Sequence, residues 1–381
     1  MEIILCVTGS VAAIETVKLA RELKRQGFEV KAFMSDDACK IIHPNALEFA
    51  TTQEVVLDLT GKIEHVKYSQ SDLILVAPAT ANVISKFAYK IADNPINSLL
   101  ITAFGHDTPI LMVPSMHDAM FTAIQKNVDK LKNEGINFIS PKMAEGKAKF
   151  PDIDDIVLAV KKETTTQTLK NKKFVITTGA TYEAIDEVRG ISNRSSGKMG
   201  LEVAKEAYIR GADVTVIHGD VNVDIPKLFE SHRVLSTLEM TSKMRELVID
   251  ADVFVSAAAV SDFSPSKVEG VKMSSSKEYD LKLTPNGKII DKIKKINPNI
   301  FLVGFKAEYD VSDEKIIDSA KKQINRCGTD LVVTNDVSIE GAGFGSDTNQ
   351  VIFVDDDIEK TGLKTKSEIA TLLIDKISDK L

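Results

Sequence analysis

A ten-residue segment in the middle of the chain, ISNRSSGKMG at 191–200, combines two cationic side chains, three serines, an asparagine and two glycines. The pattern after it predicts an amphipathic helix that ends at Gly211, followed by a strand over 212–219. A polar, glycine-bearing loop that opens a helix can hold phosphate through its backbone N–H groups and the positive end of the helix dipole. A solvated loop with a serine N-cap is the alternative, and the segment alone leaves both open.

Other polar segments directly follow apolar runs that are typical of buried strands. In the first half they are TGS (8–10), MSDDA (34–38), APATAN (77–82) and PSMHDAM (114–120). In the second half they are TTGAT (177–181), SAAAVSDF (256–263), GFKAE (304–308) and TNDVS (334–338). Ligands bind outside the carboxyl ends of the strands in open parallel sheets, so these loops are the candidate sites. Neither the GxGxxG pattern nor the P-loop pattern occurs, which removes two common nucleotide fingerprints.

Alternating strands and helices must position these loops. One β-loop-α-β unit consists of the run EIILCVT at 2–8, the pair Gly9-Ser10, a helical pattern through Leu23 and the strand FEVKAFMS. A second unit begins with FVITT at 174–178. This alternation predicts an α/β fold with two doubly wound, mostly parallel sheets. The polar, threonine-rich segment 161–173 is the expected linker. We place the boundary near residue 165, which gives domains at 1–165 and 166–381.

Length, charge and cysteine usage narrow the classes of function. A chain of 381 residues suits two domains. Its net charge of −7 disfavours a nucleic-acid partner, which would need clustered lysine and arginine. Cys6, Cys39 and Cys327 are odd in number and lack metal-ligand spacing, as expected in a reducing cytoplasm. The apolar N-terminus MEIILCVTGSVAAIE is too short for a membrane span, so no membrane partner is predicted.

Taken together, the loops resemble those of the bifunctional flavoproteins of coenzyme A biosynthesis, in which 4′-phosphopantothenoylcysteine decarboxylase precedes phosphopantothenate–cysteine ligase. The second half carries TGATYEAIDEVRGISNRSSGKMG (178–200), AAAVSDF (257–263), VGFKAE (303–308) and TNDVS (334–338) in the family's order. The first half matches in TGSVAAIE, APATANVISK, IADN and PSMHDAMF. Several positions at which the chain departs from the bacterial members are similar to an archaeal branch of the family. The resemblance implies a flavoprotein-type domain at 1–165 and a Rossmann-like domain at 166–381.

For the second domain the resemblance implies nucleotide-dependent ligation through an acyl-nucleotide. Asn193 would contact the acyl-phosphate intermediate, and Lys272 would neutralise charge on the α-phosphate. The residues implied in nucleotide binding are Ser256, Ala257, Ala258, Asp262, Lys272, Asn286, Phe305, Lys322 and Arg326. Two positions depart from the family pattern: Gly287 replaces a proline after Asn286, and Arg326 stands where lysine is usual.

For the first domain the resemblance implies FMN-dependent decarboxylation of 4′-phosphopantothenoylcysteine to 4′-phosphopantetheine. His65 would act as base, although HVKYSQSD is one residue shorter than the family spacing. Met116 and His117 would bind substrate, with His117 in place of an asparagine. Lys149 stands where bacterial relatives carry a flap cysteine, and we expect it to close the flap and donate a proton. The residues implied in FMN binding are Gly9, Ser10, Ser35, Ala77, Pro78, Ala79, Thr80 and Asn82.

The partners implied by the resemblance are small molecules: 4′-phosphopantothenate, cysteine and either CTP or ATP. FMN and Mg²⁺ are the implied cofactors, and the resemblance names no protein ligands for the metal. It also implies a homo-oligomer, with trimers of decarboxylase halves and dimers of ligase halves.

Two other functions stay open from the sequence. The first is a ligase whose N-terminal half binds FMN but is impaired in decarboxylation, because the flap cysteine is absent. The second is a nicotinamide-dependent oxidoreductase, which the architecture permits but the missing GxGxxG pattern disfavours. A scaffold protein would leave the polar strand-end loops unexplained.

Overall fold

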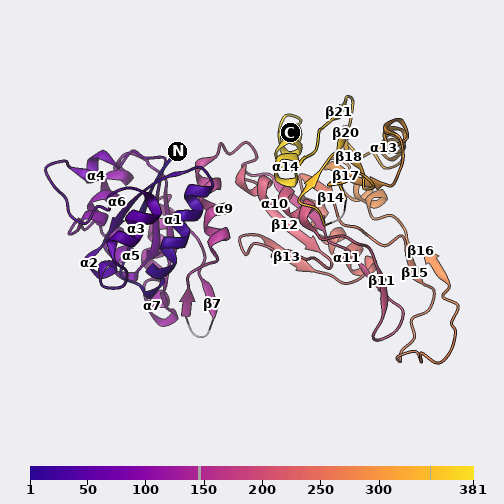
Figure 1. Cartoon of the computed structure of the whole chain (residues 1–381), viewed down its shortest axis with the longest axis horizontal. Helices are drawn as coiled ribbons and strands as arrows, with labels where there is room; N and C mark the ends of the chain where they lie inside the picture. Colours follow the sequence, from indigo (N-terminus) through magenta and orange to yellow (C-terminus); the bar gives the residue numbers. More distant parts are fainter. Residues whose placement is uncertain (145–146, 344) are drawn as a thin grey trace. The chain divides into compact units, whose positions relative to one another are not determined.

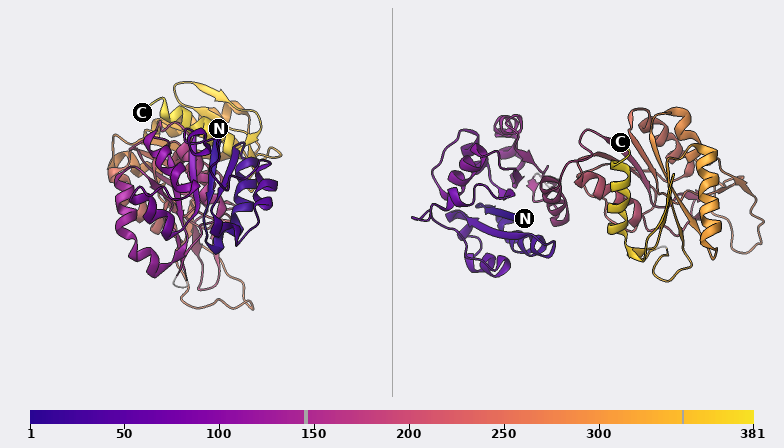
Figure 2. Two further views of the ribbon diagram at one scale, coloured as in Figure 1. Left: turned by 90° about the vertical axis from the view of Figure 1, so that its left-hand side faces the viewer. Right: turned by 90° about the horizontal axis from the view of Figure 1, so that it is seen from above.

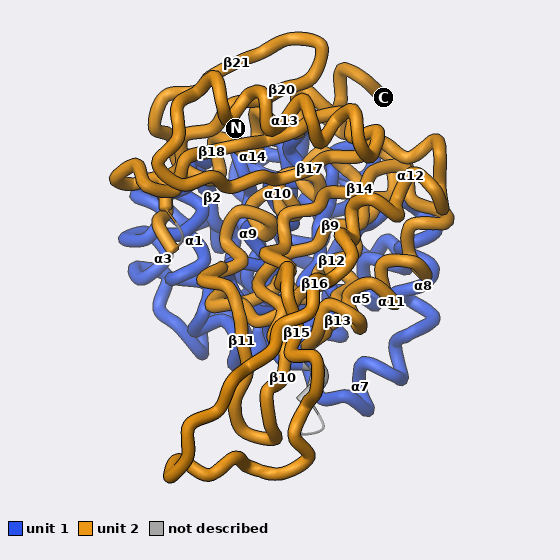
Figure 3. Tube along the Cα trace, turned by 90° about the vertical axis from the view of Figure 1, so that its right-hand side faces the viewer, with its two compact units in different colours: residues 1–165 blue, residues 166–381 orange. Residues whose placement is uncertain are grey.

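The computed structural model describes residues 1–144, 147–343 and 345–381. The chain divides into two compact units, residues 1–165 and 166–381, drawn in blue and orange in Figure 3. Each unit has its own sheet and its own hydrophobic core, so the two are described separately.

The sheet of unit 1 contains five parallel strands in the order β2-β1-β3-β4-β6. Its three central strands are buried almost throughout, as expected where helices cover both faces of a parallel sheet. The chain moves outward from β1 to β2 and then returns past β1, so the strand order reverses between β1 and β3. The strands are β1 (Glu2–Val7), β2 (Glu29–Met34), β3 (Leu73–Ala79), β4 (Ile110–Pro114) and β6 (Asn137–Phe138).

Helices cover both faces of this sheet (Figure 1). The helices α5, α6 and α8 pack on one face around Phe33 and Phe87, whereas α1 contacts α3 and α9 on the other. The helical segments are η1 (Val11–Glu15), α1 (Thr16–Arg25), α2 (Asp36–Cys39), α3 (Pro44–Thr51), α4 (Glu64–Lys67), α5 (Ala81–Ala88), α6 (Pro95–Gly105), α7 (Asp118–Ala123), α8 (Gln125–Asn133) and α9 (Ile153–Thr164).

A small antiparallel sheet with the order β5-β8-β7 lies beyond β4 in the chain. Its strands are β5 (Met116–His117), β7 (Lys142–Ala144) and β8 (Lys147–Lys149). The pairing of β5 with β8 links the PSMHDAM segment to the segment that we expected to be a flap. Gly146, the first residue of that flap, lies outside the described residues.

The main sheet of unit 2 has eight strands in the order β13-β12-β9-β14-β17-β18-β20-β21. The first six are parallel, and β20 and β21 add antiparallel pairs at one edge. The order reverses between β9 and β14, as in Rossmann-like sheets, so the α/β prediction is confirmed. The strands are β9 (Lys173–Thr178), β12 (Asp213–His218), β13 (Glu230–Arg233), β14 (Val253–Ser256), β17 (Phe301–Glu308), β18 (Leu331–Asp336), β20 (Ile352–Val354) and β21 (Ile358–Lys360).

Helices of unit 2 also cover both faces of its sheet. In Figure 1 and in the right-hand view of Figure 2, α14 and α13 lie on opposite sides of the strands. The helix α14 packs on α10, while α11, η3 and α12 share a core cluster with Phe254 and Leu302. The helical segments are α10 (Lys198–Ile209), α11 (Thr237–Leu247), η2 (Val248–Asp250), η3 (Ile290–Lys292), α12 (Ile293–Ile296), α13 (Asp313–Cys327) and α14 (Lys366–Ser378).

Two hairpin-like segments, residues 182–192 and 263–285, form a projection that we call the arm (Figures 1 and 3). It contains the pairs β10 (Tyr182–Ala184) with β11 (Gly190–Ser192) and β15 (Phe263–Pro265) with β16 (Leu283–Pro285). Asp186 ties the two segments together, because its carboxylate accepts from the N–H of Met273 at 3.0 Å and from the side chain of Arg189 at 2.6 Å. A last short pair joins β19 (Thr348–Asn349) to β22 (Lys364–Thr365).

The linker that we expected at 161–173 is five residues longer than the observed one, which covers residues 165–172. The helix α9 continues through Thr164, and β9 begins at Lys173. Residues 156–160 of α9 are buried, and Lys161 and Lys162 occupy its last turn, where the helix dipole favours cations. A polar helix end therefore has the same composition as a linker. Among the described residues, no helix combines the length and apolar character that crossing a membrane requires.

Candidate functional site

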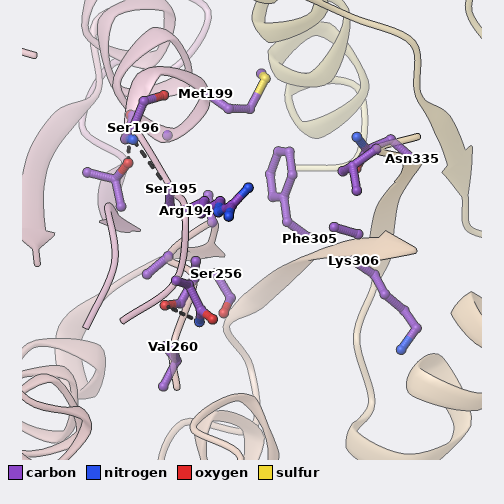
Figure 4. Close-up of a pocket in the computed structure, with 18 of the residues that line it drawn as sticks. Arg194, Ser195, Ser196, Met199, Ser256, Val260, Phe305, Lys306 and Asn335 are labelled. Carbon is purple, nitrogen blue, oxygen red and sulfur yellow. Dashed lines mark hydrogen bonds between the residues drawn. The ribbon is translucent and has the colours of Figure 1, made fainter. Parts of the chain in front are cut away.

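Unit 2 has a pocket of about 560 Å³ at the carboxyl ends of β9, β14, β17 and β18. This is where the strand order reverses, the usual ligand position in such sheets. Figure 4 shows Arg194, Phe305 and Asn335 around the pocket, from the loop before α10, from β17 and from β18.

The loop 191–197 forms one wall of the pocket and leads directly into α10. The N-cap of α10 is Gly197, with φ +78°, so the alternative of a serine N-cap is wrong. Thr178 donates from Oγ1 to the carbonyl oxygen of Gly197 at 2.8 Å. A Cβ at Gly200 would lie 2.5 Å from that same Oγ1, so the first turn of α10 requires glycine there. Asn193 donates from Nδ2 to the carbonyl oxygen of Ala259 at 3.0 Å, which links this loop to the loop after β14.

The structure brings most of the expected ligase residues into this one pocket. Those that line it are Asn193, Ser256, Ala257, Ala258, Asp262, Asn286, Phe305 and Arg326. Asn286 is also structural: its Nδ2 donates to the carbonyl oxygen of Ser261 at 3.0 Å and to Ser264 Oγ at 2.8 Å. Replacement of the family's proline by Gly287 therefore leaves Asn286 at the pocket.

Lys272 and Lys322 do not line the pocket. Lys272 is exposed on the arm, between β15 and β16. The side chain of Lys322 is 76% exposed and pairs with Asp318 at 2.6 Å. Arg326, four residues later, does line the pocket and pairs with Asp291 at 3.2 Å. The residues of α13 that line the pocket are Gln323 and Arg326, which lie three positions apart, whereas Lys322 lies about 100° around the helix from Gln323.

The described residues that line the pocket carry a strongly positive charge. Asp262 is the one acidic side chain among them, and it forms an ion pair with Lys288. Such a concentration of cations in a chain of net charge −7 favours an anionic ligand. The cationic lining residues are Arg194, Lys198, Lys288, Lys306, Arg326 and Lys366.

Sequence reasoning missed five of these six cations as site residues. Arg194 and Lys198 belong to the ISNRSSGKMG segment, Lys306 to GFKAE and Lys288 to the run after Asn286, so their motifs were a usable signal. Lys366 had no such signal, because it lies at the start of an ordinary amphipathic helix near the C-terminus.

Unit 1 has a cavity of about 640 Å³, also at the point where its strand order reverses. The expected FMN and substrate residues that line it are Gly9, Ser10, Ser35, Thr80, Asn82 and Met116. Asp36, Asp37, Asp58, Lys86 and Asp93 were not expected but line it as well.

Three hydroxyl side chains shape the mouth of this cavity by capping short helical segments. Ser10 accepts from the N–H of Ala12, Ser35 from that of Ala38 and Thr80 from that of Val83. These caps fix the loops after β1, β2 and β3, all of which line the cavity. A ligand with a phosphate group fits beside these helix starts.

Gly9 cannot carry a side chain in this geometry. A Cβ there would lie 2.4 Å from the Cβ of Asp37, on the next loop of the cavity wall. The glycine therefore permits the loops after β1 and β2 to meet closely. A loop that binds a cofactor closely needs such a contact, and the volume of the cavity lies within the 300–1,000 Å³ range of cofactor sites. The residues present fit FMN.

The remaining residues assigned to FMN lie behind the cavity. Ala77, Pro78 and Ala79 are buried in β3 and do not line it. Thr8 Oγ1 donates to the carbonyl oxygen of Pro78 at 2.7 Å and accepts from the N–H of Thr80 at 3.2 Å. Their effect on the site is to hold the loop at Thr80 in place.

Three of the four residues assigned to catalysis and substrate binding beside the flavin, His65, His117 and Lys149, do not line the cavity. His65 is half-buried on α4, and its Nδ1 is buried without a hydrogen-bond partner among the described residues. His117 caps α7 by accepting from the N–H of Ala119 at 3.3 Å. Lys149 lies at the end of β8, so residues 147–149 of the expected flap form a strand paired with β5 and β7.

Comparison with known proteins agrees with this two-part architecture. Residues 1–165 match the flavoprotein family, and residues 169–381 match the C-terminal domain of the DNA/pantothenate metabolism flavoproteins. Relatives named coenzyme A biosynthesis bifunctional protein CoaBC are 45% identical in Thermococcus kodakarensis (100% of this chain, 95% of the relative) and 40% identical in Methanocaldococcus jannaschii (99% and 93%). The relative from Bacillus subtilis is 34% identical over 96% of this chain and 93% of its own length. The chain therefore belongs to the family of bifunctional coenzyme A biosynthesis proteins.

Proposed function

We propose that unit 2 ligates cysteine to 4′-phosphopantothenate and that unit 1 decarboxylates the product to 4′-phosphopantetheine. The observation that carries the ligase assignment is the pocket at the strand reversal of unit 2, where six cations and one carboxylate line the described wall. Family membership supports the pairing of the two activities in one chain.

In the ligation, the carboxylate of 4′-phosphopantothenate attacks the α-phosphorus of CTP or ATP and pyrophosphate leaves. The amine of cysteine then attacks the acyl carbon and the nucleoside monophosphate leaves. Both steps concentrate negative charge on phosphate oxygens, which Arg326 and Lys288 can neutralise from the wall of the pocket. Asn193, already fixed to Ala259, would hold the acyl-nucleotide in position for the amine.

We propose that ligase units pair as homodimers through the arm. Several large apolar side chains of the arm are exposed, and a partner would bury them: Val188, Phe263, Val268, Val271, Tyr279, Leu281 and Leu283. Lys272 lies on the same arm, so it can serve a nucleotide only when the arm is held against a pocket. Replacing Tyr279 and Leu281 with serine should shift the mass of the full chain measured by light scattering and slow ligation.

In the decarboxylase unit, Gly9, Ser10, Ser35, Thr80 and Asn82 would hold FMN, with its phosphate at the capped loops after β1 and β2. Bound FMN would supply a two-electron acceptor and donor for the loss of the substrate carboxylate. Met116 lies on the same cavity wall, where it would exclude water from the reacting thiol.

His65 is proposed as the base, and this role requires a neighbouring copy of the unit. A base must come within hydrogen-bond reach of its proton, but His65 does not line the cavity of its own unit. Exposed apolar side chains surround it on the same segment: Leu57, Leu59, Ile63 and Val66. We therefore propose that unit 1 assembles through this patch, as a trimer. Ile63→Asp should lower the oligomer mass and decarboxylation while leaving FMN binding intact.

We also propose that Mg²⁺ accompanies the nucleotide, whose phosphates supply most of its ligands. The described residues contain no cluster of three or more His, Cys, Asp or Glu side chains that could hold a metal by themselves. Cys6, Cys39 and Cys327 are free thiols, which supports a reducing, cytoplasmic location.

The test is a full-turnover assay with purified protein, 4′-phosphopantothenate and cysteine, with CTP and ATP supplied separately. We expect pyrophosphate and carbon dioxide, and a yellow protein with bound flavin. His65→Asn should block carbon dioxide release. Lys149→Ala should accumulate an oxidised enethiol, because we propose that Lys149 protonates the product. Pyrophosphate without carbon dioxide would leave a ligase alone, and absence of both would refute the proposal.

A further inference from the structure

Lys366 is a buried lysine at the ligand pocket of unit 2. It is the first residue of α14, directly after the N-cap Thr365, and its side chain reaches back to the pocket wall. Only 7% of the residue is exposed. Its Nζ donates to the carbonyl oxygen of Ser346, which uses one of the three N–H groups of the ammonium.

The charge of Lys366 has little compensation within the chain. None of the ion pairs among the described residues includes Lys366, and the charges that act on its pKa are those of Lys198 and Asp347. Asp347 pairs instead with Lys198, at 2.6 Å, and its own side chain is 87% exposed. Burial lowers the pKa of Lys366 and the charge of Lys198 lowers it further, while the charge of Asp347 raises it by less. A buried ammonium with an incomplete set of acceptors is costly unless an anion completes it.

Lys198 and Lys366 lie on two helices that cover the same face of the sheet. Lys198 begins α10 and Lys366 begins α14, and these two helices pack on each other. The other main cation pair of the pocket, Lys288 and Arg326, comes from the η3 side and from α13. The helices α13 and α14 lie on opposite faces of the sheet (Figures 1 and 2), so Arg326 and Lys366 approach the pocket from opposite faces.

We propose that Lys198 and Lys366 form a second anion subsite, which takes the phosphate monoester of the acid substrate. This inference rests on the proposed ligase function. The reaction needs two phosphorylated substrates in one pocket, and their charges repel unless separate cations hold them apart. The triphosphate would lie with Lys288 and Arg326, next to the loops after β14 and β17, and the phosphate of the acid with Lys198 and Lys366.

The test compares two acids that differ only in that phosphate, 4′-phosphopantothenate and pantothenate. Initial rates of pyrophosphate release are measured with saturating nucleotide and cysteine, and the affinity for each acid is measured by calorimetric titration. In Lys366→Met, we expect kcat/KM and affinity for 4′-phosphopantothenate to fall about 10- to 100-fold, the range for a charged hydrogen bond. Values for pantothenate and the KM for nucleotide should stay at wild-type levels, and Lys366→Arg should recover part of the loss.

Lys364→Met is the matched control, because Lys364 lies two residues earlier on β22 and does not line the pocket. Lys198→Met provides a second variant and should show the same loss, confined to 4′-phosphopantothenate. Equal losses on both acids, a change confined to the KM for nucleotide, or no change at all would overturn the subsite. A wild-type protein that forms no amide from either acid would instead refute the ligase function itself.

Discussion

Gly9→Ala tests whether the close approach of two loops in unit 1 is a requirement for flavin binding. The new methyl group would lie 2.4 Å from the Cβ of Asp37 and 3.2 Å from its carbonyl carbon. The first distance is about 1 Å short of the minimum comfortable separation of two carbon atoms. The loops at 8–10 and 35–37 must therefore move apart, and both line the cavity.

Overpacking of this kind costs about 1–3 kcal/mol. Without ligand the loops can open and relieve the strain, whereas a bound flavin phosphate needs them together. We therefore expect the dissociation constant of FMN to rise about 5- to 150-fold, at 1.4 kcal/mol for each factor of ten. The measurement is a fluorescence titration of FMN with flavin-free protein.

Gly105→Ala is the control for this experiment. Gly105 ends α6, and a Cβ there would meet nothing within 4 Å. Pyrophosphate release by unit 2 should be unchanged in both variants, which reports that the protein is folded. Wild-type affinity for FMN in Gly9→Ala would show that the loops are not a cradle and would refute the reasoning.

Three further predictions concern unit 2. Lys272→Gln should slow pyrophosphate release on the order of 10²-fold with normal flavin content, and near-normal turnover would remove Lys272 from the mechanism. Asn193→Asp should still form the activated acid but pass it poorly to cysteine; mass spectrometry with and without cysteine checks this, and amide formation at the wild-type rate would contradict it. The hydrogen bond from Arg189 holds the pKa of Asp186 well below its usual range. The anchor between the arm segments therefore persists above pH about 4, and it is lost only as the pH falls through the lowered pKa that Asp186 has in the folded protein. Asp186→Asn should raise hydrogen exchange over 266–282 at every pH from 5 to 8, and unchanged exchange would show that Asp186 does not anchor the arm.

The strand-end loops were predictable because they combine two local signals. Apolar runs such as 174–178 are too short for buried helices and are typical of buried strands, and the glycine or small polar residues after them mark the ends. Once the sheet is parallel, those ends gather at one edge, which is why Asn193, Asp262 and Phe305 line one pocket although they are far apart in the chain.

The positions of single long side chains were not predictable in the same way. Lys322 and Arg326 are about one helical turn apart, but which of them faces the pocket depends on how α13 is rotated against the sheet. Lys366 enters the pocket because α14 packs on α10, a contact between segments more than 150 residues apart. The position of Lys272 relative to a pocket depends on how the arm is held, and no local sequence pattern specifies that.

The residues that line the pocket of unit 2 span Thr178 to Lys366, nearly the whole unit, and those of the other cavity span Thr8 to Met120. Neither site can exist in a partly unfolded unit, so each ligand stabilises only the unit that holds it. At a hundred times its dissociation constant, a ligand adds about 2.7 kcal/mol to the stability of the state that binds it. Heating the protein with nucleotide or with flavin should therefore delay the melting of a different unit in each case. A variant that has lost its chemistry but kept its fold would still show that delay, which separates a damaged active site from a damaged protein.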